Sequence, residues 1–183
     1  MEVAAAESAQ NSRMPFLPPE LYEQIEQSVP IVCVDFVPVM RNADGEIDRL
    51  GLIRRHSPYG EVWCHLGGRV RFGETVAHAI DRHLTESIGD VSLGLGVDPQ
   101  PEYVYQWFPE RVAPDNGLLF GRDPRKHSVG LSFIVEIEGE PAAVPESEAL
   151  DFAYWPVDAL PETWPGCVQL FERLGLIEQS HVA

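Results

Sequence analysis

The middle of the chain carries four polar side chains at intervals of four residues: Glu74, His78, Arg82 and Glu86. On a helix this spacing places all four on one face, where a carboxylate and a guanidinium one turn apart can fix each other's rotamers. Gly67 and Gly68 precede them, and glycine is needed where backbone turns tightly or approaches an anion closely. The first N–H groups of a helix after such a loop can bind phosphate. The pattern therefore predicts a polar, anion-binding site along a helix.

A second set of residues predicts how this helix is positioned. Apolar side chains also recur every four residues, on the opposite side: Val76, Ile80, Leu84 and Ile88. This stripe predicts an amphipathic helix that starts near Thr75, ends at Gly89 and packs on a core. The β-rich run 61–66 predicts a strand that delivers the glycine loop. An ordinary strand–loop–helix with a surface Arg–Glu pair is the alternative interpretation.

The spacing resembles the Nudix box, in which a glycine is followed by a glutamate after five residues and by an arginine after seven more. The positions that fit this motif are Gly68, Glu74, Arg82, Leu84, Glu86 and Gly89. His83 and Ser87 stand where the box has metal-binding or catalytic glutamates, and Asp90 replaces its last apolar residue. The resemblance implies a Nudix fold of the α/β class, with a mixed β-sheet sandwiched between helices.

From about Leu17 onward, the chain also resembles the GDP-mannose mannosyl hydrolase branch of the Nudix superfamily. The shared stretches are Pro30–Asp35, Gly51–Arg54, Trp63, Gly67–Val70, His127 and Tyr154–Leu160. Substrate-binding arginines of that branch map onto Arg54, Arg69 and Arg82, which implies a nucleoside-diphosphate derivative as the small-molecule partner. The planar fork of arginine suits phosphate oxygens better than the point charge of lysine does. A general preference of the genome for arginine is the alternative for any single position.

The same resemblance implies a divalent-metal site. In that branch the ion binds a backbone carbonyl of the glycine loop, a helix glutamate and a side chain of a late loop. The carbonyl maps onto Gly67, whereas the helix glutamate maps onto Ser87, so the adjacent Glu86 is the candidate. In the late loop 146–151 the family's histidine is absent, and Glu148 is the candidate metal ligand and general base. We expect Mg²⁺, or Mn²⁺, to be weakly held by Gly67, Glu86 and Glu148.

The candidate catalytic residues are therefore Glu86, Glu148 and His127, whose family counterpart lies near the substrate. His83 has two interpretations, as a metal ligand or base, or as a structural side chain that hydrogen-bonds a loop carbonyl, and the structural role is favoured. The long polar stretch 109–126 predicts a substrate lid. Three aromatic residues either stack a nucleobase or fill the core: Tyr103, Tyr105 and Trp107.

Composition limits the partners and the compartment. The net charge of −16 argues against nucleic acid and anionic membranes as partners, because both need basic protein surface. No apolar run approaches the roughly 20 residues of a membrane span, and the N-terminus lacks the basic and apolar regions of a secretory signal. Three separated cysteines in apolar surroundings indicate reduced core thiols: Cys33, Cys64 and Cys167. We expect a cytoplasmic protein.

The chain as a whole predicts one Nudix-like domain, 17–178, between a disordered tail, 1–16, and a short tail, 179–183. Expected helices cover 18–28 and 167–174, and expected strands cover 31–40, 50–55, 61–66, 102–108, 128–138 and 152–155. Pro38 predicts an edge strand or a bulge. The leading helix is short and has an apolar face, so we expect it to pack on a second subunit or on the sheet edge, giving a homodimer.

Three functions stay open at this level. The first is a hydrolase of a nucleoside diphosphate linked to a sugar or similar group, in which arginines and a divalent ion stabilise the leaving-group charge. The second is a catalytically inactive Nudix-fold nucleotide-binding protein, and the third is a biosynthetic enzyme that uses the same pocket without metal. The arginines, with Glu74 and Glu86, favour retained ligand binding, whereas His83 and Ser87 favour the inactive binder.

Overall fold

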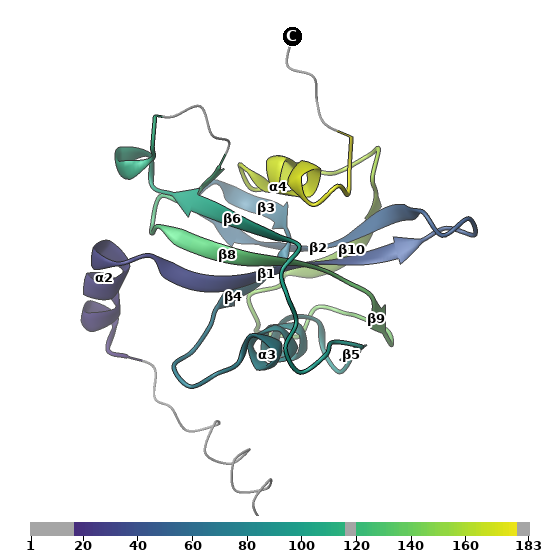
Figure 1. Ribbon diagram of the computed structural model, residues 1–183, viewed down its shortest axis with the longest axis horizontal. Helices are drawn as coiled ribbons and strands as arrows, with labels where there is room; N and C mark the ends of the chain where they lie inside the picture. Colours follow the sequence, from purple (N-terminus) through teal and green to yellow (C-terminus); the bar gives the residue numbers. More distant parts are fainter. Residues whose placement is uncertain (1–16, 116–119, 179–183) are drawn as a thin grey trace, which may run out of the picture.

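The computed structural model describes residues 17–115 and 120–178 (Figure 1). The expected tails, 1–16 and 179–183, and part of the expected lid lie outside these ranges. Within the described part of the chain, no helix is both long and apolar enough to cross a bilayer.

The described residues form an eight-stranded mixed sheet and a second, two-stranded one. The strands of the main sheet are β1 (Ile31–Arg41), β2 (Ile47–Ser57), β3 (Gly60–Cys64), β4 (Leu66–Arg69), β6 (Tyr103–Phe108), β7 (Gly121–Arg122), β8 (Ser128–Val135) and β10 (Asp151–Pro156). Their order is β10-β2-β1-β8-β6-β7, with β3 beside β2 and β4 beside β1. Since β1 runs parallel to β8 and antiparallel to β2 and β4, the sheet is mixed, as predicted.

The helices cover both sides of this sheet. They are α2 (Pro19–Ser28), α3 (Val76–Ile88), α4 (Cys167–Arg173) and a short 3₁₀ helix, η1 (Glu110–Val112). Figure 1 shows α3 and α4 on opposite sides of the central strands, with α2 beside the start of β1. The predicted α/β sandwich is therefore confirmed.

The boundaries of α3 follow from its caps. The hydroxyl of Thr75 accepts a hydrogen bond from the backbone N–H of His78 (3.2 Å), which satisfies one of the free N–H groups of the first turn. Gly89 ends the helix with φ 91° and ψ −160°, a backbone conformation of positive φ that glycine adopts at low cost. Between the caps the predicted apolar stripe is buried, with Ile80 and Leu84 fully so. The helix thus lies fixed on the sheet and can hold polar groups in place on its other side.

Pro38 does not mark an edge strand, because β1 is the central strand of the sheet. On one side β1 pairs with β8 over residues 31–38. On the other side it pairs first with β4, over residues 33–36, and then with β2, from Val39 to Arg41. Pro38 lies where β1 changes partner, and a residue without an N–H group loses little there. A register irregularity does occur close by, between Met40 and Arg41.

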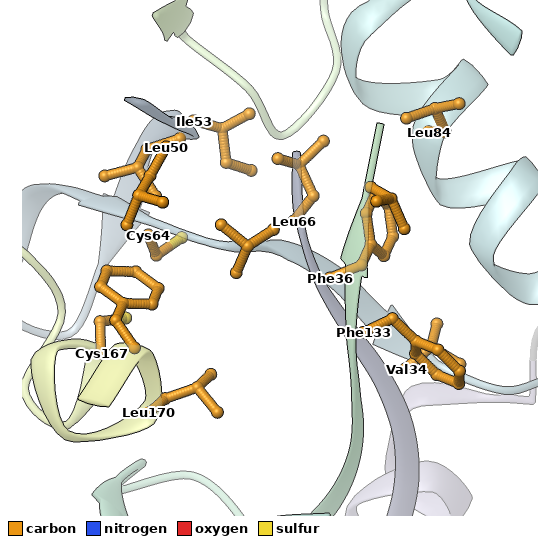
Figure 2. Close-up of a cluster of buried hydrophobic side chains, with 14 of the residues drawn as sticks. Val34, Phe36, Leu50, Ile53, Cys64, Leu66, Leu84, Phe133, Cys167 and Leu170 are labelled. Atoms are coloured by element: carbon orange, nitrogen blue, oxygen red, sulfur yellow. The ribbon is translucent and has the colours of Figure 1, made fainter. Parts of the chain in front are cut away.

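The core joins both sides of the sheet to the helices. Buried side chains of the central strands pack with Leu84 of α3 and with Cys167 and Leu170 of α4 (Figure 2). All three cysteines are free and buried, as predicted. Burial raises the pKa of the Cys33 and Cys64 thiols to about 12, so both are protonated at neutral pH. They act as small apolar residues.

Two short strands, β5 (Ser92–Leu93) and β7, were not predicted. β7 lies within the stretch 109–126 that was expected to form a lid, and β5 pairs with β9 (Ile137–Glu138). The predicted strand 128–138 is correspondingly divided, because β8 ends at Val135 and the chain leaves the main sheet before β9. Strands of two residues have too little pattern to be detected from sequence.

Candidate functional site

A cavity of about 1030 Å³ lies beside β4, the strand that contains Gly67 and Gly68. Its walls come from segments far apart in sequence: α2, β4 and the loop after it, α3, the segment 123–128 and the loop 144–148. Small-molecule sites usually enclose roughly 300–1,000 Å³. The cavity is therefore large enough for a ligand with several linked groups.

Basic side chains are concentrated around this cavity. Six of the thirteen Lys and Arg residues of the chain line it: Arg55, Arg69, Arg71, Arg82, Arg125 and Lys126. Only six of the 29 Asp and Glu residues do so: Glu26, Asp35, Glu86, Asp123, Glu146 and Glu148. The lining is balanced in formal charge, whereas the rest of the chain carries the whole net charge of −16. An anionic ligand is therefore repelled by most of the surface and tolerated here.

Arg82 is held by the loop that precedes its helix. Its Nε and Nη2 atoms donate to the two carboxylate oxygens of Glu74 at 2.7 and 2.9 Å, and Nη2 also donates to the carbonyl of Arg69 at 3.1 Å. Burial raises the pKa of Glu74, but the hydrogen bonds from Arg82 and from the backbone N–H of Arg71 outweigh it and bring the pKa below its ordinary value. Arg82 thus clamps the loop 69–74 to α3.

His83, the next residue of α3, contacts the same carbonyl as Arg82. Its Nε2 atom lies 3.2 Å from the carbonyl oxygen of Arg69. A Cβ at Gly68 would lie 2.5 Å from Cε1 of His83, so only glycine leaves room for the ring. Burial, and then the charge of Arg82, lower the pKa of His83, which favours the neutral imidazole as a donor to that carbonyl. This geometry supports the structural interpretation of His83.

Gly67 is required by its own surroundings. Its φ is 137°, which other residues rarely adopt, and a Cβ there would overlap the carbonyl of Val34 on the paired strand β1. The predicted glycine loop is thus part of strand β4, whose backbone can approach β1 closely at this position.

The two candidate metal-binding carboxylates both line the cavity, and each is already paired. Glu86 accepts from Nη1 of Arg82 at 3.2 Å and from Nη2 of Arg71 at 3.4 Å. Glu148 lies 2.8 Å from Nη1 of Arg55. Their side chains are 51% and 34% exposed, so ligands can reach both.

The structure separates Arg54 from the cavity and brings in its neighbour. Adjacent residues of a strand point to opposite faces, and it is Arg55 that lines the cavity. The guanidinium of Arg54 lies outside it, with Nη1 3.6 Å from Glu61. His127 also lies outside the lining: its ring stacks on Phe108 with centroids 4.2 Å apart, and Nε2 lies 3.2 Å from the amide oxygen of Gln106.

A buried polar group forms the floor of the cavity. Asp35, which is 5% exposed, accepts a hydrogen bond from Nε1 of Trp107 at 3.0 Å and lies 3.4 Å from Nε2 of His65. The other nitrogen of His65 lies 3.6 Å from the sulfur of Cys167. Trp107 is thus a buried floor residue that stacks on His65. Tyr105 fills the core and donates to the carbonyl of Gly166 at 3.2 Å.

Aromatic rings hold several of the cavity's arginines. Arg125 forms a bidentate pair with buried Asp123, and its guanidinium lies 5.1 Å from the ring centre of Trp164. The guanidinium of Arg69 lies 4.1 Å from the ring centre of Tyr22, on α2. Such cation–π contacts fix the plane of a guanidinium group, and in Arg125 the Nε and Nη2 atoms are in addition held by Asp123.

A family model described as "Domain of unknown function (DUF4916)" matches residues 12–164, most of the chain. The chain belongs to the DUF4916 family. Comparison with curated protein sequences found no match.

Solved structures similar to this DUF4916 chain include proteins described as NUDIX hydrolases or NUDIX domains. It is 25% identical to a possible asymmetric diadenosine tetraphosphate hydrolase from Jonesia denitrificans, over 84% of this chain and 99% of that one, with a TM-score of 0.67. It is 21% identical to a MutT NUDIX hydrolase from Burkholderia pseudomallei, over 81% and 98%, with a TM-score of 0.59. It is 18% identical to the NUDIX domain of Shewanella oneidensis NrtR complexed with ADP ribose, over 87% and 92%, with a TM-score of 0.51. The predicted Nudix fold is confirmed.

The residues that line the DUF4916 cavity can be compared with the ligands that a divalent cation requires. In the described ranges, no three His, Cys, Asp or Glu side chains lie close enough to hold an ion by themselves. Mg²⁺, however, is commonly bound by one or two carboxylates together with phosphate oxygens and water. Glu86, Glu148 and the backbone at Gly67 line one cavity, so the donor set fits a cation that the ligand's phosphates complete.

Several lining residues of the DUF4916 cavity were missed at the sequence level. Asp35, His65 and Arg125 have no recognisable motif and come from different strands and loops. The concentration of arginines between residues 49 and 82 was the one available signal, and it could not separate Arg55 from Arg54.

Proposed function

We propose that this protein is a Nudix-type hydrolase that cleaves a nucleoside diphosphate linked to a sugar or similar group, with the assistance of Mg²⁺ or Mn²⁺. The observation that carries the proposal is the concentration of nearly half of the chain's basic side chains around one cavity of an acidic protein. A diphosphate presents several oxygens in a fixed arrangement, and the forked donors of arginine match it.

The arginines that line the cavity have two different roles in this proposal. Arg55, Arg69 and Arg71 line the cavity and are the candidate contacts to the diphosphate. Arg82 is committed to Glu74, so it positions the loop that carries Arg69 and Arg71. Preorganised cations stabilise the charge that develops on a diphosphate leaving group more effectively than water does.

The divalent cation would be held by Glu86, Glu148 and the backbone at Gly67. When bound, it would polarise a phosphate oxygen and neutralise charge on the leaving group. Glu148 is also the candidate general base, since its carboxylate is accessible and lies in the late loop. His127, which lies outside the cavity lining, would reach the substrate only at the cavity's outer edge.

Similar structures add support for the class of substrate. The Shewanella oneidensis domain was solved with ADP ribose, and another similar structure, 15% identical over 98% of this chain and 80% of that one, with a TM-score of 0.56, is a UDP-X diphosphatase. The Jonesia denitrificans protein is described as a hydrolase of diadenosine tetraphosphate. All of these compounds contain linked phosphates.

A panel experiment tests the proposal. The purified protein is incubated with nucleotide sugars, ADP ribose and diadenosine tetraphosphate, with and without Mg²⁺, and turnover and thermal stabilisation are measured in parallel. We expect metal-dependent turnover of at least one compound, strongly reduced in Glu86→Gln. Absence of both binding and turnover across the panel would reject the proposal.

The inactive binder is the second candidate, and one observation favours it. His83 and Ser87 occupy positions where the box has glutamates, and His83 is committed to the carbonyl of Arg69. Thermal stabilisation by a nucleotide, without turnover and without any effect of EDTA, would establish binding as the function.

A further inference from the structure

Arg55 and Glu148 form an ion pair inside the cavity. Nη1 of Arg55 lies 2.8 Å from the carboxylate of Glu148, and the side chains are 22% and 34% exposed. Both side chains line the cavity that the proposed function assigns to the diphosphate and the cation. In this arrangement the candidate phosphate contact and the candidate metal ligand neutralise each other.

Arg55 is the fixed member of the pair. It lies within β2, where it pairs with Val62 of β3, one residue beyond the end of the pairing with β10. Its guanidinium lies 5.9 Å from the ring centre of Trp164, whose own indole N–H donates to the carbonyl of Arg122 at 2.6 Å. A cation held by a sheet and by an anchored ring has little freedom to move.

Glu148 lies on a loop whose backbone is held in place. The N–H of Val144 donates to the carbonyl of Ser87 at 3.0 Å, and the N–H of Leu150 donates to the carbonyl of Arg54 at 2.7 Å. The loop turns at Glu146, the one non-glycine residue with positive φ (62°) among those described, and such conformations are concentrated at functional loops. The side chain of Glu148 is 34% exposed, so its carboxylate can change partner by a change of rotamer without movement of the backbone.

We propose that Arg55 latches Glu148 while the cavity lacks a ligand, and that a diphosphate binding to Arg55 releases Glu148 to the divalent cation. The inference rests on the proposed function, and it adds the order of events. The two phosphates of a nucleotide sugar together carry two negative charges, against one on a carboxylate, and their oxygens compete directly for the guanidinium. The freed carboxylate is then available to the cation that bridges it to the phosphates. Cation and diphosphate favour each other's binding, and this coupling is reciprocal.

The latch can be tested without any nucleotide. Mn²⁺ is titrated into the full-length protein, and binding is followed by calorimetry and by the loss of the free-ion electron paramagnetic resonance signal. Breaking the latch with Arg55→Gln should tighten Mn²⁺ binding by at least about fivefold, the lower end of typical coupling effects. The matched control is Arg41→Gln, which breaks an exposed pair with Glu136 of similar length (2.7 Å) outside the cavity and should leave the affinity unchanged.

A double-mutant cycle shows whether a gain in Mn²⁺ affinity comes from the release of Glu148 or only from the loss of a positive charge near the cation. If Arg55 acts by sequestering Glu148, the gain disappears when Arg55→Gln is made in a Glu148→Gln background. A gain that persists in that background, or no gain in Arg55→Gln, overturns the proposal. If Arg55→Gln does not fold, Arg55→Lys weakens the pair while keeping the charge and should give a smaller gain that also requires Glu148. Because no nucleotide is used, these results are independent of whether the panel of substrates is hydrolysed.

Discussion

At the scale of single residues, the site depends on which side chain of a neighbouring pair faces the cavity. Arg54 and Arg55 have the same chemistry, but Arg55 pairs with Glu148 within the cavity lining and Arg54 faces Glu61 outside it. The resemblance to GDP-mannose mannosyl hydrolase pointed to Arg54. A shift of one residue in the alignment of a strand reverses the face.

This difference gives the first prediction. Arg55→Ala should weaken the binding of a nucleoside diphosphate by about 1.5–3 kcal/mol, because charge-assisted hydrogen bonds contribute in that range. Arg54→Ala is the matched comparison and should cost markedly less. Isothermal titration calorimetry of both variants with the same ligand measures the two losses of affinity. A larger loss of affinity in Arg54→Ala than in Arg55→Ala would show that Arg54 is the substrate-binding arginine, as the resemblance implied.

The second prediction concerns the pH dependence contributed by His83. Its folded pKa lies below its ordinary value of about 6.5, mainly because of burial and the Arg82 charge, although the hydrogen bond with the Arg69 carbonyl and the charges of Glu148 and Glu86 act in the opposite direction. As the pH falls below about 6.5, the unfolded state takes up a proton that the folded state resists, so stability decreases. His83→Gln keeps a donor for the Arg69 carbonyl and removes the titration.

Melting temperatures of wild type and His83→Gln should therefore diverge in slope between pH 7 and the lowered pKa of His83. The wild type should lose stability more steeply as the pH falls. Parallel curves would show that His83 makes no contribution in this range.

At the scale of elements, the sequence predicted a helix or strand best where the spacing of its apolar residues and its capping residues indicated the same boundaries. Thr75, the stripe with Ile80 and Leu84, and Gly89 fixed α3 from its start to its end. The alternation of apolar and polar residues also predicted β8 correctly, and the proline at its start predicted where α2 begins. By contrast, β5 and β9 consist of two residues each and depend on a contact between distant segments, which no local pattern records.

The candidate site was only partly predictable for the same reason. The loop and helix that hold Gly67, Arg69, Arg82 and Glu86 are contiguous in sequence, and all four line the cavity. Asp35, His65 and Arg125 reach it through the pairing of β1 with β4 and the path of the segment after β7. Their placement depends on tertiary packing, so residue type and spacing gave no sign of it.

The third prediction tests the clamp between α3 and the loop before it. Arg82→Ala leaves the carboxylate of Glu74, whose side chain is 5% exposed, without its bidentate partner. Removing one member of a buried ion pair typically costs 3–5 kcal/mol, so we expect a loss of about 3 kcal/mol in the free energy of unfolding.

Chemical denaturation of Arg82→Ala and of Arg41→Ala provides the comparison. The Arg41–Glu136 pair has side chains 45% and 64% exposed, so its loss should cost about 1 kcal/mol or less. Equal losses in the two variants would mean that Arg82 does not clamp the loop. A weaker ligand affinity in Arg82→Ala should then follow from displacement of Arg69 rather than from a lost phosphate contact.

At the scale of the whole molecule, α2 is the helix with no buried residue among α2, α3 and α4. Its contacts with the rest of the chain include the Arg69–Tyr22 stack and a long Lys126–Glu26 pair (3.9 Å). Between α2, the start of β1 and the loop after β4 lies a second, largely apolar cavity of about 610 Å³. A helix this short gains most of its stability from packing, and here much of the apolar surface is left uncovered.

The last prediction is that this apolar surface is the interface of a homodimer. Its most exposed large side chain is Phe72, at 89%, with Leu17 and Val32 nearly half exposed beside it. Apolar surface gathered in one groove usually marks an interaction site, and the resemblance to GDP-mannose mannosyl hydrolase also implies a dimer. Light scattering at micromolar concentration should give twice the mass of 20.4 kDa for wild type. Phe72→Ser should shift the protein towards the monomer, whereas Val97→Ser, which changes a side chain 97% exposed outside the groove, should not. A monomeric wild type, or equal behaviour of the two variants, would place the dimer interface elsewhere or remove it.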